Sequence, residues 1–234
     1  MRATLGSSLQ SASTGRGVLC QKGHSSTATC SSRCAVAAGD ARLFDFYTTL
    51  GHDLEEALKR ARAMFPVTKR PARYTLTMSH MSRVKVNRLR NQEEAMDAYR
   101  WKEDPSDTWQ TTVFLKAACT TEQERRRPAG NRPQDMILWK GLQLIGAGHR
   151  CLKGVFYEVE AVDEVFVWLN NGIKLTHEQA LQSLRLSYAL TYASCQGLTL
   201  PGVVRLDTRS THFTLKHLYV GLSRAKAAHL VEVY

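Results

Sequence analysis

The C-terminal part of the chain alternates strand-like and helix-like segments, and this alternation limits the possible folds more than any other feature. Residues 185–191 ("RLSYALT"), 202–206 ("GVVRL") and 228–234 ("AHLVEVY") are short apolar runs, whereas residues 214–226 ("TLKHLYVGLSRAK") have helical periodicity. Strands that alternate with helices form a parallel sheet covered by helices, since each parallel connection must return to the same end of the sheet. We therefore predict an α/β fold.

The upstream residues extend this pattern. Residues 54–65 ("LEEALKRARAMF") place apolar side chains on one helical face and precede Pro66, which ends a helix. Residues 73–79 ("RYTLTMS") predict a strand, and residues 80–99 predict a helix with Ser79 as its N-cap. Charged, Pro-containing segments that follow predict loops.

A different pattern occupies the middle of the chain. Four short strand-like runs broken by Gly and Asn fall within residues 136–175, and residues 176–184 ("THEQALQSL") predict a short helix that opens with a capping box. The sequence therefore predicts a small β module, at about residues 134–175, inserted into the α/β domain. The predicted organisation is an extension at residues 1–40, a helical lead-in at 41–71 and the α/β domain at 72–234.

The N-terminal residues differ from the rest in composition. Residues 1–39 are rich in Ser, Thr, Ala and Gly and contain no Asp or Glu. We predict that this segment is disordered, because it has too little apolar surface to offset its ordering entropy. Its composition also resembles an organellar transit peptide, so a nuclear and an organellar location both stay open. The string Cys20, His24, Cys30 and Cys34 has a short middle gap for a zinc finger, and no metal site is predicted.

The charge of the chain points to a polyanionic partner. Its 32 Lys and Arg residues exceed its 21 Asp and Glu residues, which gives a formal net charge of +11. Between Lys69 and Gln92 there are seven Lys or Arg residues and no acidic one. Nucleic acid is the simplest partner for such a chain, and Lys85 and Arg88 are candidate contacts. No apolar run reaches the length of about 18 residues that a membrane span requires, so no membrane partner is expected.

Two further features have both a structural and a functional interpretation. Gln196–Gly197 follows a predicted strand, where open α/β sheets bind ligands, but a Gln-Gly pair is also an ordinary turn. Arg224 ends a predicted helix, where an arginine offsets the helix dipole or reaches a phosphate.

Together these segments resemble a known family. Residues 186–200 ("LSYALTYASCQGLTL"), then "VVRLD" and 217–226 ("HLYVGLSRAK"), resemble motifs V and VI of superfamily one DNA helicases, in particular the RecD/Pif-like branch. Residues 74–91 ("YTLTMSHMSRVKVNRLRN") more weakly resemble motif IV. The resemblance implies a RecA-like parallel sheet, the UvrD-like helicase C-terminal domain, and the β module corresponds in position to the SH3-like insertion of this branch.

The resemblance implies a role for individual residues. Arg224 matches the arginine finger of motif VI, and Gln196 and Gly197 match the nucleotide-sensing turn of motif V. Arg83 matches a motif IV basic residue close to phosphate. The expected nucleic-acid contacts are Thr191, Ser194, Lys85 and Arg88. Less certain stacking surfaces are Trp139 and Tyr157, for which a place in the core of the β module is the favoured alternative.

The sequence also departs from the family pattern. Ala193, Ser194 and Cys195 replace the usual histidine, lysine and serine, which removes a basic contact and an imidazole. No G-x-x-x-x-G-K-[ST] segment occurs, and the only Asp-Glu pair, Asp163–Glu164, falls in the β module.

The first RecA-like domain is therefore expected to be missing from this sequence. We predict the C-terminal part of an ATP-dependent DNA helicase, which acts on single-stranded or duplex DNA with the missing domain as its partner. ATP and Mg would bind mainly to that domain, so no cofactor and no ATP hydrolysis are expected for this chain alone. The alternative is a non-catalytic module, derived from a helicase, that binds nucleic acid or a partner.

Overall fold

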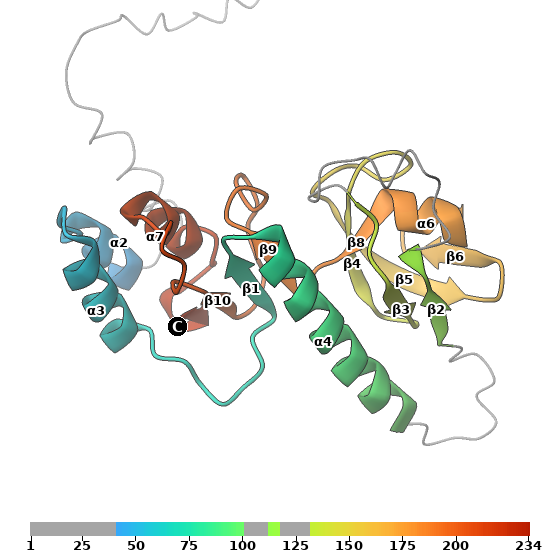
Figure 1. The fold of residues 1–234 in the computed structure, drawn as a ribbon, viewed down its shortest axis with the longest axis horizontal. Coiled ribbons are helices and arrows are strands. Elements are labelled where there is room, and N and C mark those ends of the chain that lie inside the picture. Colours follow the sequence, from blue (N-terminus) through green and yellow to red (C-terminus); the bar gives the residue numbers. More distant parts are fainter. Residues whose placement is uncertain (1–40, 101–111, 118–131) are drawn as a thin grey trace, which may run out of the picture.

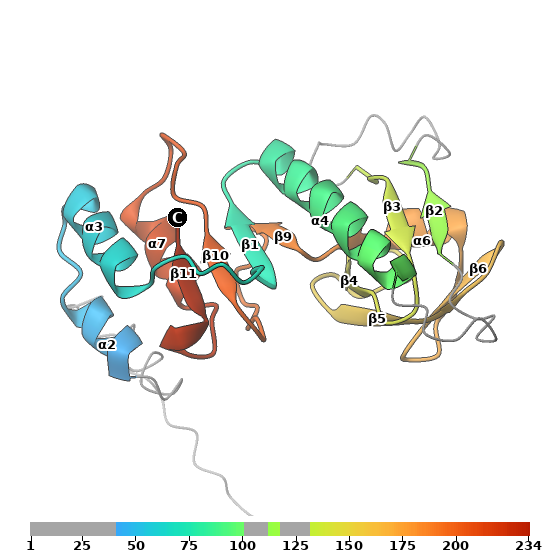
Figure 2. The same ribbon diagram turned by 90° about the horizontal axis from the view of Figure 1, so that it is seen from below.

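The computed structural model of the protein describes residues 41–100, 112–117 and 132–234 (Figure 1). The predicted disordered extension and the Cys20–Cys34 string lie outside the described residues. Two parts, a parallel sheet with helices and an antiparallel β module, lie on opposite sides of one long helix (Figures 1 and 2).

The first part is a parallel sheet of four strands, as the sequence predicted. Its strands are β1 (Tyr74–Thr77), β9 (Ala189–Thr191), β10 (Val204–Leu206) and β11 (Val231–Val233), in the order β11-β10-β1-β9. Every pair is parallel, and Leu76 in β1 lies opposite both Leu190 and Leu206. The strands are buried over nearly their whole length because helices cover both faces.

Helices surround this sheet. α3 (Leu54–Met64) and α7 (Leu215–Leu222), with the short α2 (Ala41–Thr48), lie on one side, and α4 (His80–Arg100) lies on the other (Figures 1 and 2). Gly221 allows α7 to approach β10 closely, because a Cβ at this position would lie 2.7 Å from a methyl group of Leu206. The buried core of this part includes Phe46, Phe65, Tyr74, Tyr192, Phe213, Leu218 and Leu222.

The β module is antiparallel. Its five-stranded sheet has the order β7-β6-β5-β4-β8, with α6 (His177–Ser183) packed against it. In a separate two-stranded sheet, β2 (Val113–Leu115) pairs antiparallel with β3 (Met136–Leu138). The five strands are β4 (Gln143–Gly146), β5 (Phe156–Val162), β6 (Phe166–Leu169), β7 (Lys174–Thr176) and β8 (Leu184–Leu186).

One predicted strand proved to be two. Residues 185–191 were expected to form one strand, but β8 belongs to the module and β9 to the parallel sheet. The break occurs at Ser187 and Tyr188, where the chain crosses from one part to the other. The antiparallel sheet therefore extends past the predicted module boundary, since β8 pairs with β4.

Two buried asparagines connect α4 to both parts of the structure. The amide of Asn87 donates to the carbonyl oxygens of Leu186 and Ala189 (both 3.3 Å) and accepts from Ala189 N (2.7 Å). One turn later, Asn91 donates to Ile137 O (2.9 Å) and accepts from Ile137 N (2.7 Å). Asn87 is therefore bonded to the junction of β8 and β9, and Asn91 to β3, so α4 fixes the module against the sheet.

None of the helices within the described ranges has the length and apolar character needed to cross a membrane.

Candidate nucleotide and nucleic-acid site

The loop after β9 is held by its own hydroxyl groups. Thr191 is buried, and its hydroxyl donates to Ser194 Oγ (3.0 Å) while it accepts from Ser194 N (3.2 Å). Ser194 Oγ in turn accepts from Thr191 N and donates to Thr191 O (both 3.0 Å). The hydroxyl of Thr191 thus orders the loop, whereas Ser194 stays exposed at its surface.

The next residues form the Gln-Gly turn. Gln196 is exposed, and Gly197 has a φ of +82°, a left-handed conformation that favours glycine. Cys195 is fully buried, and its thiol lies 3.3 Å from Tyr192 O. Desolvation by burial raises the pKa of Cys195 to about 11, so the thiol stays protonated and fills space in the core.

Arg224 joins the end of α7 to this same loop. Its guanidinium donates to Leu198 O (3.1 Å) and to Ser223 Oγ (2.9 Å), and its Nε donates to Val220 O (3.2 Å). Its backbone carbonyl accepts from Leu200 N (2.8 Å). The segments that resemble motifs V and VI are therefore one bonded unit, with a half-buried arginine at their junction.

An N-terminal helix packs beside this arginine. The ring of Tyr47 in α2 lies 5.0 Å from the ring of Tyr219 in α7. Desolvation, and then the neighbouring Tyr219, raise the pKa of Tyr47, while the positive charge of Arg224 opposes this rise. Tyr219 therefore packs, and the surroundings of Arg224 on this side are aromatic.

A cavity of about 690 Å³ lies between the sheet and the β module; we call it the inter-module cavity. It brings together four of the predicted site residues: Arg83, Thr191, Ser194 and Gln196. Gly197 and Arg224 are not part of its lining. The other residues that line it are His80, Ile145, Gly146, Ala147, Lys153, Gly154, Arg185, Leu186, Ala189, Leu190 and Ala193.

The inter-module cavity is basic. Arg83 and Arg185 are buried in its wall, and Lys153 is exposed at its rim. Burial lowers the pKa of Arg83, but an arginine stays charged at neutral pH. Arg185 donates to the carbonyl oxygens of Leu181 and Leu184 (both 2.6 Å), which hold its charge in place.

Three basic residues of this cavity were not singled out from the sequence. Lys153 and Arg185 lie in the β module, and only the fold brings them to the loop after β9. His80 begins α4, and burial, followed by the charge of Arg83, lowers its pKa. A basic residue in an otherwise apolar strand, as at Arg185, was the one available signal.

Lys85 and Arg88 lie elsewhere, in a second cavity of about 560 Å³ between α4 and the residues that precede β3. We call it the α4–β3 cavity. His80 lines both cavities, so the two adjoin. The predicted nucleic-acid contacts are thus divided between two neighbouring basic cavities.

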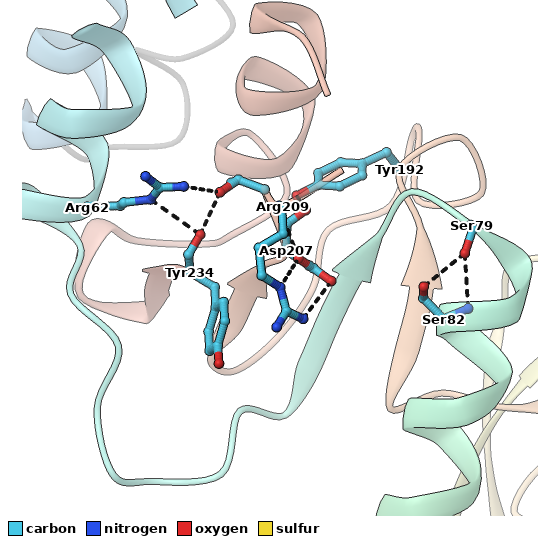
Figure 3. A network of polar contacts seen from close by, with 8 residues as sticks. Arg62, Ser79, Ser82, Tyr192, Asp207, Arg209 and Tyr234 are labelled. Carbon is cyan, nitrogen blue, oxygen red and sulfur yellow. Dashed lines mark hydrogen bonds and ion pairs between the residues drawn. The ribbon is translucent and has the colours of Figure 1, made fainter. Parts of the chain in front are cut away.

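A set of polar contacts also lies at the carboxyl ends of β1 and β10 (Figure 3). Ser79 accepts from Ser82 N (3.0 Å), which confirms it as the N-cap of α4. Asp207 and Arg209 form a two-pronged ion pair (2.9 and 3.1 Å). Tyr192 donates to Asp207 O (3.3 Å), while Arg62 in α3 donates to the C-terminal residue Tyr234 (Figure 3).

The two candidate stacking aromatics belong to the module core. Tyr157 is buried, and its hydroxyl accepts from Leu152 N (2.9 Å), so it offers no face to a base. Trp139 is partly buried against the same core. In the described ranges, no group of three or more His, Cys, Asp or Glu side chains is placed to hold a metal ion.

Comparisons with known proteins give a fold-level likeness only. No protein-family model matches the chain, and no curated protein matches it. Among solved structures, the Pif1 helicase from Candida albicans matches with 18% identity and a TM-score of 0.49, over 83% of this chain and 53% of that one. A Bacteroides Pif1 bound to single-stranded DNA matches with 14% identity and a TM-score of 0.43, over 76% and 45%. This chain therefore spans about half the length of the structures it matches.

Proposed function

We propose that this chain is the second RecA-like domain, with its inserted β module, of a superfamily one DNA helicase of the RecD/Pif-like branch. The bond between Arg224 and the Leu198 carbonyl is the observation that carries the proposal. It joins the two sequence segments that resemble motifs V and VI, on a four-stranded parallel sheet. An arginine finger and a nucleotide-sensing turn need this kind of physical link to act together.

Arg224 is the proposed arginine finger. Its planar fork of donors suits the oxygens of a γ-phosphate, on which charge develops during phosphoryl transfer. In the free chain these donors are held by Leu198 O and Ser223 Oγ. A nucleotide presented by a P-loop domain would compete for the same donors. Binding of ATP would therefore break the bond between Arg224 and Leu198 O and change the contacts of the loop after β9.

That loop also lines the inter-module cavity through Ser194 and Gln196. The cavity is the proposed seat of the DNA strand, with Arg83, Lys153 and Arg185 as its positive charges. A strand held mainly by phosphate contacts binds without sequence preference and loses affinity with salt. Thr191 acts here by ordering the loop that carries Ser194.

ATP and Mg²⁺ belong, in this proposal, to the absent P-loop domain. From this chain, Arg224 and Gln196 are the side chains proposed to act on the nucleotide. This chain would complete the nucleotide site from across a cleft.

Two observations favour a second candidate, a binding module without catalysis. The Nε, Nη1 and Nη2 atoms of Arg224 all donate hydrogen bonds within the chain. Cys195 is buried at the position where the family has a serine. If Arg224 kept these bonds when a nucleotide binds, it would only stabilise the fold.

A measurement of ATP hydrolysis by the purified chain tests whether nucleotide binding requires a separate P-loop domain. We expect no hydrolysis above background, because no P-loop is present. In a chimera that joins the P-loop half of the Candida albicans Pif1 helicase to this chain, Arg224→Ala should reduce DNA-stimulated hydrolysis by about 10³-fold. Lys226→Ala, an exposed change two residues away, is the matched control and should leave the rate unchanged.

Hydrolysis by the chain alone that Arg224→Ala abolishes would contradict the assignment of a domain without a P-loop. An active chimera whose rate is the same with Ala at position 224 would favour the non-catalytic module.

A further inference from the structure

The α4–β3 cavity contains a buried amide without a partner. Gln134 lines this cavity and is only 6% exposed. Among the residues that the structure describes, neither its Nε2 nor its Oε1 has a hydrogen-bond partner. A buried amide that bonds to nothing is costly, and such groups are rare in folded proteins. An unsatisfied donor and acceptor side by side therefore point to a ligand that supplies both.

The segment that carries Gln134 is fixed on the C-terminal side of this residue. The neighbouring Asp135 accepts from Ala117 N (2.7 Å), and Asn91 holds Ile137 through two bonds. Gln134 thus directly precedes residues that are bonded to α4 and to the end of β2. A preorganised amide of this kind loses little entropy when it binds.

The remaining lining supplies two other kinds of contact. Lys85, Arg88 and Arg132 are exposed cations around the cavity, suited to a phosphate. Met81 is 82% exposed, and with Val84 it offers an apolar surface to the face of a base. A volume of about 560 Å³ accommodates a nucleotide.

An amide pairs with the edge of a base through one donor and one acceptor, as glutamine does with adenine. We propose that the α4–β3 cavity binds one nucleotide of the single strand and that Gln134 reads its base. The strand would continue past His80 into the inter-module cavity, which His80 also lines. This inference rests on the proposed function, and it adds a base preference to an otherwise sequence-independent site.

Binding of short single strands to the full chain tests this site. Fluorescence anisotropy would compare labelled strands of about 12 nucleotides made of dA, dC or dT, and an abasic strand of equal length. We expect dA to bind about tenfold more tightly than the other strands, which is the discrimination of one bidentate base contact. In Gln134→Met, which keeps the length of the side chain but removes the amide, all four strands should bind alike.

Gln182→Met is the matched control, because Gln182 lies on α6 and lines neither cavity. It should keep the preference for dA. The melting temperature of Gln134→Met should equal or exceed that of the wild type, since the change removes an unpaired buried amide.

Four outcomes would overturn the inference. Salt-sensitive binding of all strands with equal affinity by the wild type would exclude a base-reading pocket but leave the proposed function intact. A preference for dA that persists in Gln134→Met would place the base elsewhere. A strong fall in melting temperature would show that Gln134 has a structural partner, and absence of binding at any salt concentration would refute both proposals.

Discussion

Asn87 and Gln134 are both buried amides at the boundary between the sheet and the β module, but they differ in their partners. Asn87 forms three hydrogen bonds with the backbone at Leu186 and Ala189, whereas Gln134 forms none within the described residues. The first amide stabilises the fold, and the second is the one that we propose binds a ligand. The buried amides of this protein are therefore of two kinds: those with backbone partners, which stabilise the fold, and those without a partner, to which we assign ligand binding.

The residues that resemble helicase motifs mostly belong to the first group. Thr191 bonds to Ser194, and Arg224 bonds to Leu198 and Ser223. These contacts preorganise the loop after β9 before any ligand arrives. Exposed groups such as Gln196 and Lys153 complete the surface that a ligand would meet.

The largest expected effect on stability follows from Asn87→Leu. The change leaves the carbonyl groups of Leu186 and Ala189 and the N–H of Ala189 without this partner, so the free energy of unfolding should fall by about 3 kcal/mol. Chemical denaturation measures this loss. Leu89→Ala, on an exposed part of the same helix, is the control and should change stability little. A small effect of Asn87→Leu would remove the contrast with Gln134.

Glu232 provides a second satisfied group, and its effect depends on pH. Burial alone would raise the pKa of Glu232, but hydrogen bonds from Thr68 and Arg205 (2.6 and 2.8 Å), and the charge of Arg205, hold it below its ordinary value. A carboxylate with a lowered folded-state pKa stabilises the fold above its unfolded pKa of about 4.3, and this stabilisation is lost as the pH falls through the folded value.

Glu232→Gln should therefore lower the free energy of unfolding by about 2 kcal/mol at neutral pH. Denaturation curves at a series of pH values should show the two proteins converging as the pH falls below about 4. A gap of the same size at acidic and neutral pH would mean that the ion pair with Arg205 does not provide the stabilisation.

The smallest of these effects is expected for Thr191→Val. The change keeps the shape of the side chain but removes its bonds with Ser194, which should cost about 1 kcal/mol of unfolding free energy. Hydrogen exchange should show faster exchange of the Ser194 amide. An unchanged exchange rate would mean that the loop is ordered by other contacts, such as the buried Cys195.

Much of the sheet was readable from the sequence, because β1, β10 and β11 are short apolar runs next to helices with clear periodicity. The crossing at Ser187–Tyr188 was not, since β8 and β9 are both apolar and nothing in their composition separates two sheets. The two segments that resemble motifs V and VI are bonded through Leu198 and Arg224, a contact that the sequence alone did not predict.

The cavities were less accessible to sequence reasoning. Lys153, Arg185 and Gln134 come from the β module or its borders, and only tertiary packing brings them to α4 and to the loop after β9. Gln134 follows a segment with the composition of a loop, where a polar residue is expected to be exposed. In the fold it is buried, and it lines a cavity together with residues of α4, which is far away in sequence.

Single-strand binding as a function of salt concentration tests the central claim most directly. The full chain should bind a short single strand, and its affinity should fall steeply as salt rises, because released counterions drive the binding. Lys153→Glu, at the rim of the inter-module cavity, should weaken binding by about tenfold and lower the salt slope by about 1, whereas Lys140→Glu on the module surface should do much less. Absent or salt-insensitive binding, or equal effects of the two substitutions, would contradict the account.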